Sequence, residues 1–140
     1  MENTVLRRQA ADIFQAALRA VDPYGLVKEQ ADRLASICHD EKCGRIMLVS
    51  FGKAAFPMAR ALSDALPRMI GGGVLITKDG HLQPHRLPAQ ISIHEAAHPT
   101  PDARGVRATA EALRLIRTAD SETLVVCLVS GGGSALLISP

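Results

Sequence analysis

The pattern of hydrophobic and polar positions divides the chain into helical segments and short, uninterrupted apolar runs. Apolar residues recur at helical spacing before residue 22 and again after Asp22-Pro23, a pair typical of a helix start. We therefore expect two helices at the N-terminus, each with one apolar face. The first stripe comprises Leu6, Ala10, Ile13, Ala17, Leu18 and Val21, and the second comprises Val27, Ala31, Leu34 and Cys38.

Short apolar or alternating runs bounded by glycine or polar residues indicate β-strands. Helical spacing follows the first run and returns before the last, where we expect Thr100 to cap a helix with Pro101 at its first position and Asp102 in its first turn. Apolar strands joined by helical crossovers need both faces covered, so the sequence predicts an α/β fold with a mostly parallel sheet of about four strands covered by helices. The predicted strands are residues 46–51, 74–77, 90–94 and 124–129.

The last of these runs, Leu124 to Val129, is wholly apolar and predicts a buried strand in which Cys127 acts as a small hydrophobe. It ends in Ser130-Gly131-Gly132-Gly133-Ser134, which we call the glycine turn, and an apolar segment follows. Since the sequence stops at Pro140, that segment is either an ordered terminal stub or the start of a helix in a longer protein.

Charge and composition narrow the range of partners. Sixteen basic and fourteen acidic residues give a net charge of +2 with both signs interspersed, so we expect neither nucleic acid nor an anionic membrane as a partner. No run approaches the length of a membrane span and the first 21 residues do not resemble a signal peptide. The odd number of cysteines, Cys38, Cys43 and Cys127, favours a reducing cytoplasm. The chain could also form a homo-oligomer.

The glycine turn is the first candidate for chemistry. Backbone N–H groups without side chains at the end of a strand suit a phosphate or a carboxylate. The alternative is a turn in which glycine allows close packing of strand and helix. Neither G-x-G-x-x-G nor G-x-x-x-x-G-K-[ST] occurs in the chain, so the usual nucleotide-binding motifs are absent.

Further candidates follow the other strands, whose carboxyl ends share one edge of a parallel sheet. Lys53 follows Gly52 at the end of the first strand and could contact the same anion as the glycine turn, although a lysine at a helix start is usually only solvated. The spacing His94-Glu95-x-x-His98 imitates a zinc-protease helix, yet His94 ends a strand and Pro99 follows His98, so we favour a ligand-lining loop over a metal site. The Cys38-His39 pair with Cys43 lacks a second pair of metal ligands.

Four segments together resemble one family. They are FGKAAFPMA (51–59), VLITKDG (74–80), EAAHPTPDARG (95–105) and LVSGGGSALL (128–137), and in this order they are similar to the amino-terminal domain of the glycerate 2-kinases, whose carboxyl-terminal part is called the MOFRL domain. The resemblance implies that residues 1–140 are the front part of a Rossmann-like amino-terminal domain in a two-domain enzyme, and that the MOFRL domain is absent from this sequence.

The resemblance further implies phosphorylation of D-glycerate to 2-phosphoglycerate with ATP and Mg²⁺. Lys53 matches the lysine of the family's GKAA motif, Ser130 to Ser134 match its glycine loop, and His98, Pro99 and Asp102 match its HP-x-PD motif. We therefore expect Lys53 and Asp102 as catalytic residues, and His98 with the glycine turn as the substrate or phosphate site. Asp102 could accept the hydroxyl proton or hold magnesium, and could equally be a helix cap.

Two other interpretations remain open. The chain could be a module that binds a carboxylated or phosphorylated metabolite without turnover, or an incomplete domain that self-associates through an exposed sheet edge. The sequence also leaves open which group the glycine turn holds.

Overall fold

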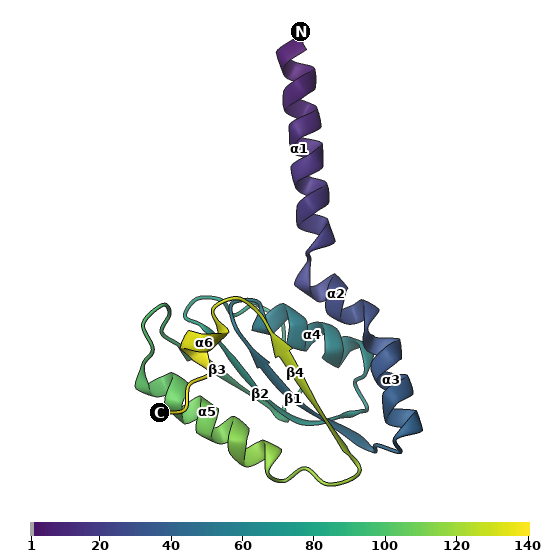
Figure 1. Cartoon of the computed structure of the whole chain (residues 1–140), viewed down its shortest axis with the longest axis vertical. Coiled ribbons are helices and arrows are strands. Elements are labelled where there is room, and N and C mark those ends of the chain that lie inside the picture. The colour runs from purple at the N-terminus through teal and green to yellow at the C-terminus, as the bar shows by residue number, and fades with distance from the viewer. Residues whose placement is uncertain (1) are drawn as a thin grey trace.

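The computed structural model describes residues 2–140 as a four-stranded sheet with helices on both faces (Figure 1), which confirms the predicted fold class. The strands are β1 (Arg45–Phe51), β2 (Ile70–Lys78), β3 (Ile91–Ala96) and β4 (Thr123–Val129). The helices are α1 (Glu2–Ala20), α2 (Pro23–Glu29), α3 (Ala31–Asp40), α4 (Ala55–Ala65), α5 (Ala103–Ile116) and α6 (Gly133–Leu136).

The strands lie in the order β3-β2-β1-β4, and every neighbouring pair is parallel. The end of β1 is in register with its neighbours, since Phe51 pairs with Ile76 of β2 and with Val129 of β4. The loops that leave the strand ends therefore lie along one side of the sheet, which we call the carboxyl edge.

The core has two layers because side chains of β1 alternate between the two faces of the sheet. Ile46 and Leu48 pack with Phe56 of α4 on one face. Val49 packs with Ala108 of α5 on the other. Side chains on both faces of the central strands are therefore shielded from water. This explains why the sequences of these strands are continuous apolar runs rather than alternating ones.

The second strand is longer than its sequence pattern predicts, since β2 starts at Ile70 rather than at Val74. Glycine is favoured inside this strand because a Cβ atom at Gly73 would lie 3.0 Å from the Leu48 carbonyl oxygen and 3.2 Å from the Ile91 side chain. Three adjacent strands therefore pack closely at this point, and a side chain there would have to displace its neighbours by a few tenths of an ångström.

The N-terminal part contains three helices instead of the two predicted. Asp22 caps α2 as expected, accepting a hydrogen bond from the Gly25 N–H at 2.8 Å, and Pro23 takes the first position. The helix then ends at Gln30, whose N–H donates to the Val27 carbonyl, and α3 begins at the next residue. Because the helical spacing of apolar residues continues across this break, the sequence pattern does not reveal it.

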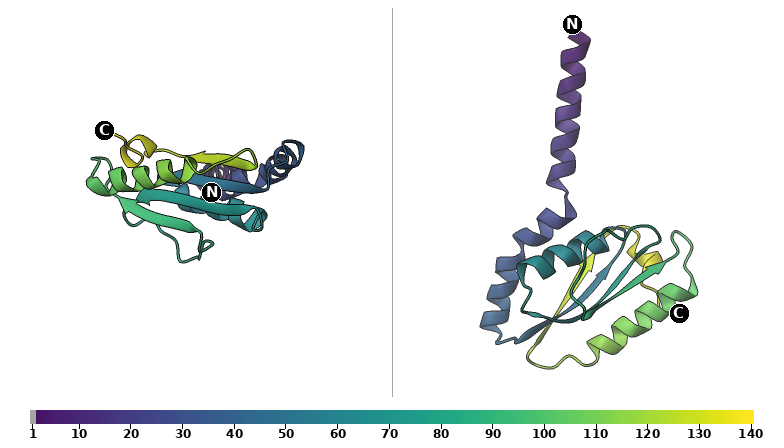
Figure 2. Two further views of the ribbon diagram at one scale, coloured as in Figure 1. Left: turned by 90° about the horizontal axis from the view of Figure 1, so that it is seen from below. Right: turned by 180° about the vertical axis from the view of Figure 1, so that it is seen from behind.

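Helix α1 extends away from the sheet (Figure 1 and the right panel of Figure 2). It is amphipathic as predicted, but within residues 2–140 nothing covers its apolar stripe, and Ile13 is 72% and Phe14 60% exposed. No helix in this range has the length and apolar character that a membrane span requires.

Strand β4 corrects the prediction of a fully buried strand. Only Val126 in it is buried, and Cys127 is exposed rather than packed in the core. The reason is its position at the end of the sheet, where Leu124 and Leu128 pack against the layer under α4. Helix α5 covers β2 and β3 on the other face and leaves that side of β4 open.

Candidate functional site

Three loops meet at the carboxyl edge. The first joins β1 to α4 and carries Gly52 and Lys53, the second is the glycine turn between β4 and α6, and the third joins β3 to α5 and carries His98. The predicted juxtaposition of these segments follows from the parallel register of their strands.

The first two loops are joined by a set of hydrogen bonds through Ser130. The Ser130 N–H donates to the Phe51 carbonyl at 3.1 Å, and its hydroxyl accepts from the Ala54 N–H at 3.0 Å. The Lys53 N–H donates in turn to the Gly131 carbonyl at 3.0 Å. The Ser130 hydroxyl thus accepts a hydrogen bond from a backbone N–H at the start of α4 that has no partner within the helix. This structural role is sufficient to explain a serine at position 130.

Gly52 permits this close approach. Its φ of +115° and a Cβ atom that would lie 2.2 Å from the Ser130 hydroxyl oxygen both exclude a side chain. Gly52 therefore allows the Lys53 backbone to come close enough to form its hydrogen bond with the glycine turn.

Gly132 is the point at which the predicted site residues converge. A Cβ atom there would lie 2.9 Å from His98 Nε2 and 3.1 Å from Lys53 Cε, and its φ is +86°. The side chains of Lys53 and His98 thus lie over the glycine backbone from two other strand ends. The structure brings these three residues together as the sequence predicts.

The glycine turn also presents free backbone donors. In the described part of the chain, the N–H groups of Gly131 and Gly132 donate to no acceptor, whereas the Gly133 N–H donates to the Ser130 carbonyl at 3.3 Å. Gly133 is buried against the Phe51 ring, and Ser134 is exposed. The adjacent N–H groups of Gly131 and Gly132 are donors of the kind that can hold an anion.

Asp102 lies apart from this convergence and caps α5. This corrects the prediction of Thr100 as the cap. Its carboxylate accepts from the N–H groups of Arg104 at 3.0 Å and Gly105 at 3.3 Å, and from Arg104 Nε at 2.7 Å. The Arg104 side chain, and then the two backbone donors, hold the pKa of Asp102 below its ordinary value. These are contacts of a helix cap, and its role as a base stays a prediction.

His94, Glu95 and His98 do not share a helix. His94 and Glu95 belong to β3, and His98 lies in the following loop. Among residues 2–140, no three His, Cys, Asp or Glu side chains form a cluster that could hold a metal ion.

Two residues with contacts at this edge are not predicted from the sequence. His81 Nδ1 lies 3.1 Å from the Lys53 carbonyl oxygen, and the buried Thr77 hydroxyl donates to the Gly52 carbonyl at 3.1 Å. Thr77 lies near the end of β2 and His81 in the loop after it, so their position at a strand end was the available signal. Together they support the backbone on either side of the Gly52–Lys53 bond.

Comparison with known proteins identifies relatives of this chain. The family model described as the domain of unknown function DUF4147 matches residues 9–140. A Thermotoga maritima protein named D-glycerate 2-kinase is 35% identical over 96% of this chain, and a Pyrococcus horikoshii protein named glycerate 2-kinase is 36% identical over 89%. An Agrobacterium vitis protein provisionally named as a hydroxypyruvate reductase is 36% identical over 97%.

The fold is found in a solved structure as well. The crystal structure of glycerate kinase from Thermotoga maritima matches with a TM-score of 0.82 and 34% identity, over 95% of this chain and 30% of that one. The chain spans 28 to 30% of the length of the three curated relatives named above. The chain therefore belongs to the DUF4147 family, and the resemblance to the amino-terminal part of the glycerate 2-kinases is confirmed.

Proposed function

We propose that this chain forms one wall of the active site of an ATP-dependent glycerate 2-kinase, which converts D-glycerate to 2-phosphoglycerate. The observation that carries the proposal is the convergence of Lys53 and His98 on Gly132, beside the unpaired N–H groups of Gly131 and Gly132. Relatives named glycerate 2-kinases support the choice of reaction.

Phosphoryl transfer needs alignment and neutralisation of charge more than covalent help from the protein. The Lys53 ammonium supplies a positive charge at the carboxyl edge, and the two glycine N–H groups supply fixed donors that cost no reorganisation. This arrangement suits a phosphate of ATP and the carboxylate of glycerate equally. His98 then contacts the same anion or the neighbouring hydroxyl.

The described residues do not by themselves form a magnesium site. Asp102 is committed to the start of α5 and to Arg104, and Asp79 forms a two-pronged pair with Arg104 at 2.7 Å in each contact. Among residues 2–140, neither Asp79 nor Asp102 is left without a partner to hold Mg²⁺.

The proposal is tested by joining residues 1–140 to the part of the Thermotoga maritima enzyme that follows the matched region. We expect the fused protein to form ADP and 2-phosphoglycerate from ATP, Mg²⁺ and D-glycerate. Lys53→Ala should lower kcat/KM by about a hundredfold or more, since it removes a charge that acts on the transferred group. Lys28→Ala, an exposed lysine on α2, is the control and should retain full turnover.

Near-normal turnover of Lys53→Ala would remove the lysine from the mechanism. Reduction of hydroxypyruvate by NADH, without ADP formation, would replace the kinase by a reductase, an outcome that the absence of a G-x-G-x-x-G motif argues against.

A second candidate is a module that binds a phosphorylated or carboxylated metabolite without turnover. The observation that favours it is the open glycine turn, in which Gly131 and Ser134 face solvent. Residues 1–140 alone would then bind ATP or glycerate at the glycine turn, and the fused protein would bind with the same affinity and form no ADP.

A further inference from the structure

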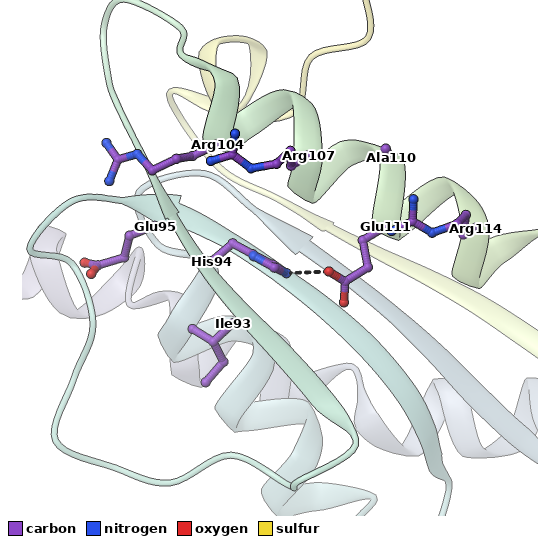
Figure 3. A pocket seen from close by; sticks show the side chains of 8 residues that line it. All are labelled: Ile93, His94, Glu95, Arg104, Arg107, Ala110, Glu111 and Arg114. Carbon is purple, nitrogen blue, oxygen red and sulfur yellow. Dashed lines mark ion pairs between the residues drawn. The ribbon is translucent and has the colours of Figure 1, made fainter.

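A groove lined by polar side chains lies between β3 and α5. Its volume is about 580 Å³, within the range of small-molecule sites. None of Lys53, His98 or the glycine turn lines it. Figure 3 shows that its polar side chains come from the two elements that face each other, and they include His94, Glu95, Arg104, Arg107, Glu111 and Arg114.

The side chains at the floor of the β3–α5 groove already contact one another. Glu111 accepts a hydrogen bond from the Ser92 hydroxyl, and its other oxygen lies 3.0 Å from His94 Nε2 (Figure 3). That histidine nitrogen is enclosed and, within residues 2–140, it makes no contact with the geometry of a hydrogen bond. Glu111 is therefore held at the floor, and within residues 2–140 it forms no ion pair with Arg107 or Arg114.

Two arginines of the groove are uncommitted. Arg104 is paired with Asp79 and Asp102, but in the described chain no carboxylate lies within ion-pair distance of Arg107 or Arg114. Both are exposed and follow each other by seven positions on α5, so they lie on the same side of the helix, about 10 Å apart along its axis.

This arrangement selects a class of ligand. A guanidinium presents two parallel N–H donors that match a carboxylate or a phosphate. Two such groups, separated along one helix and facing a common groove, fit a molecule with an anionic group at each end of a short chain. A ligand with a single carboxylate can form the two-pronged contact with one arginine and leaves the other without a partner.

We propose that the β3–α5 groove is a second small-molecule site, which binds a bis-anionic compound through Arg107 and Arg114. The compound carries two carboxylates, or a carboxylate and a phosphate. The site is independent of the proposed phosphoryl transfer, since the two share no residue.

Isothermal titration of residues 1–140 tests this assignment with two probes. Glutarate carries two carboxylates, and 3-phosphonopropionate carries one carboxylate and one phosphonate, so their relative affinities distinguish the two chemistries. Arg107→Gln and Arg114→Gln should each weaken binding of the preferred probe by about tenfold, the value of one charge-assisted contact, and the double variant should abolish it. Butyrate, with a single carboxylate, should bind at least tenfold more weakly than glutarate.

Arg117→Gln is the matched control, because Arg117 is an exposed arginine of the α5 end that does not line the groove. It should leave the affinity unchanged, as should Lys53→Ala. Unchanged affinity in the double variant would overturn the site, and so would equal losses in Arg117→Gln or an absence of binding by both probes. Loss of binding in Lys53→Ala would place the probe at the carboxyl edge instead.

Discussion

Gly132 holds a backbone conformation that favours glycine, at the place where the side chains of two other loops cross it. Gly132→Ala should destabilise the fold by about 1–2 kcal/mol from the left-handed φ alone. It should also displace His98 and Lys53, because its Cβ atom would lie 2.9 Å and 3.1 Å from their atoms. Thermal unfolding together with ATP affinity measures both effects.

Gly80→Ala separates the two effects. Gly80 has a similar φ of +76°, but a Cβ atom there would meet nothing within 4 Å. It should lose comparable stability and keep its ATP affinity. If Gly132→Ala also keeps its affinity, the convergence on Gly132 has no part in ligand binding.

The lowered pKa of Asp102 predicts how the stability of the chain depends on pH. Hydrogen bonds from Arg104 lower the pKa of this carboxyl in the folded state, so its stabilising effect is fully present above the ordinary value of 3.8 and disappears as pH falls through the lowered value. Asp102→Ala should therefore lower the melting temperature at pH 7, with a difference from the parent chain that shrinks at acid pH. Thr100→Ala should be neutral at both pH values, because Asp102 rather than Thr100 caps α5.

At the scale of elements, α1 and α4 should contribute very differently to stability. Phe56 of α4 is 2% exposed in the core, so Phe56→Ala should cost about 3–5 kcal/mol. Ile13→Gln and Phe14→Gln on α1 should change the denaturation midpoint of the sheet very little, because these side chains are exposed. A large loss from the α1 changes would mean that its stripe is buried in solution.

The exposure of Cys127 provides a test of the position of β4 at the edge of the sheet. Cys127 is exposed, whereas Cys38 is buried and burial raises the pKa of its thiol, which lowers the fraction of reactive thiolate. A maleimide added to the native protein should therefore label Cys127 first and Cys38 only on unfolding, as followed by mass spectrometry. Equal early labelling of both residues would contradict this placement.

These elements show what the sequence pattern can and cannot predict. The strands of the sheet, the helix cap at Asp22 and the end of the first strand before Gly52 follow from local chemistry, and they are found close to where the pattern puts them. Burial does not follow in the same way, because an apolar run is identical whether a strand is central or at an edge. The stripe of α1 and the exposure of Cys127 depend on what packs against them, which local sequence does not specify.

At the scale of the whole molecule, the parallel sheet explains why distant segments share one edge. The convergence of Lys53, His98 and Gly132 was predictable, since all three follow parallel strands. The pairing of Ser130 with the start of α4, and of His81 with the Lys53 carbonyl, was not, because it depends on the paths of the loops. The same holds for the β3–α5 groove, whose arginines are separated in sequence from the strand they face.

The most direct test of the central claim is the amide spectrum of residues 1–140 during titration with ATP and then with D-glycerate. With either ligand, the N–H signals of Gly131 and Gly132 should shift first and furthest, and the His98 ring signals should move with them. Lys53→Ala should weaken the response at least tenfold. Shifts confined to other parts of the molecule, or an unchanged response in Lys53→Ala, would contradict it.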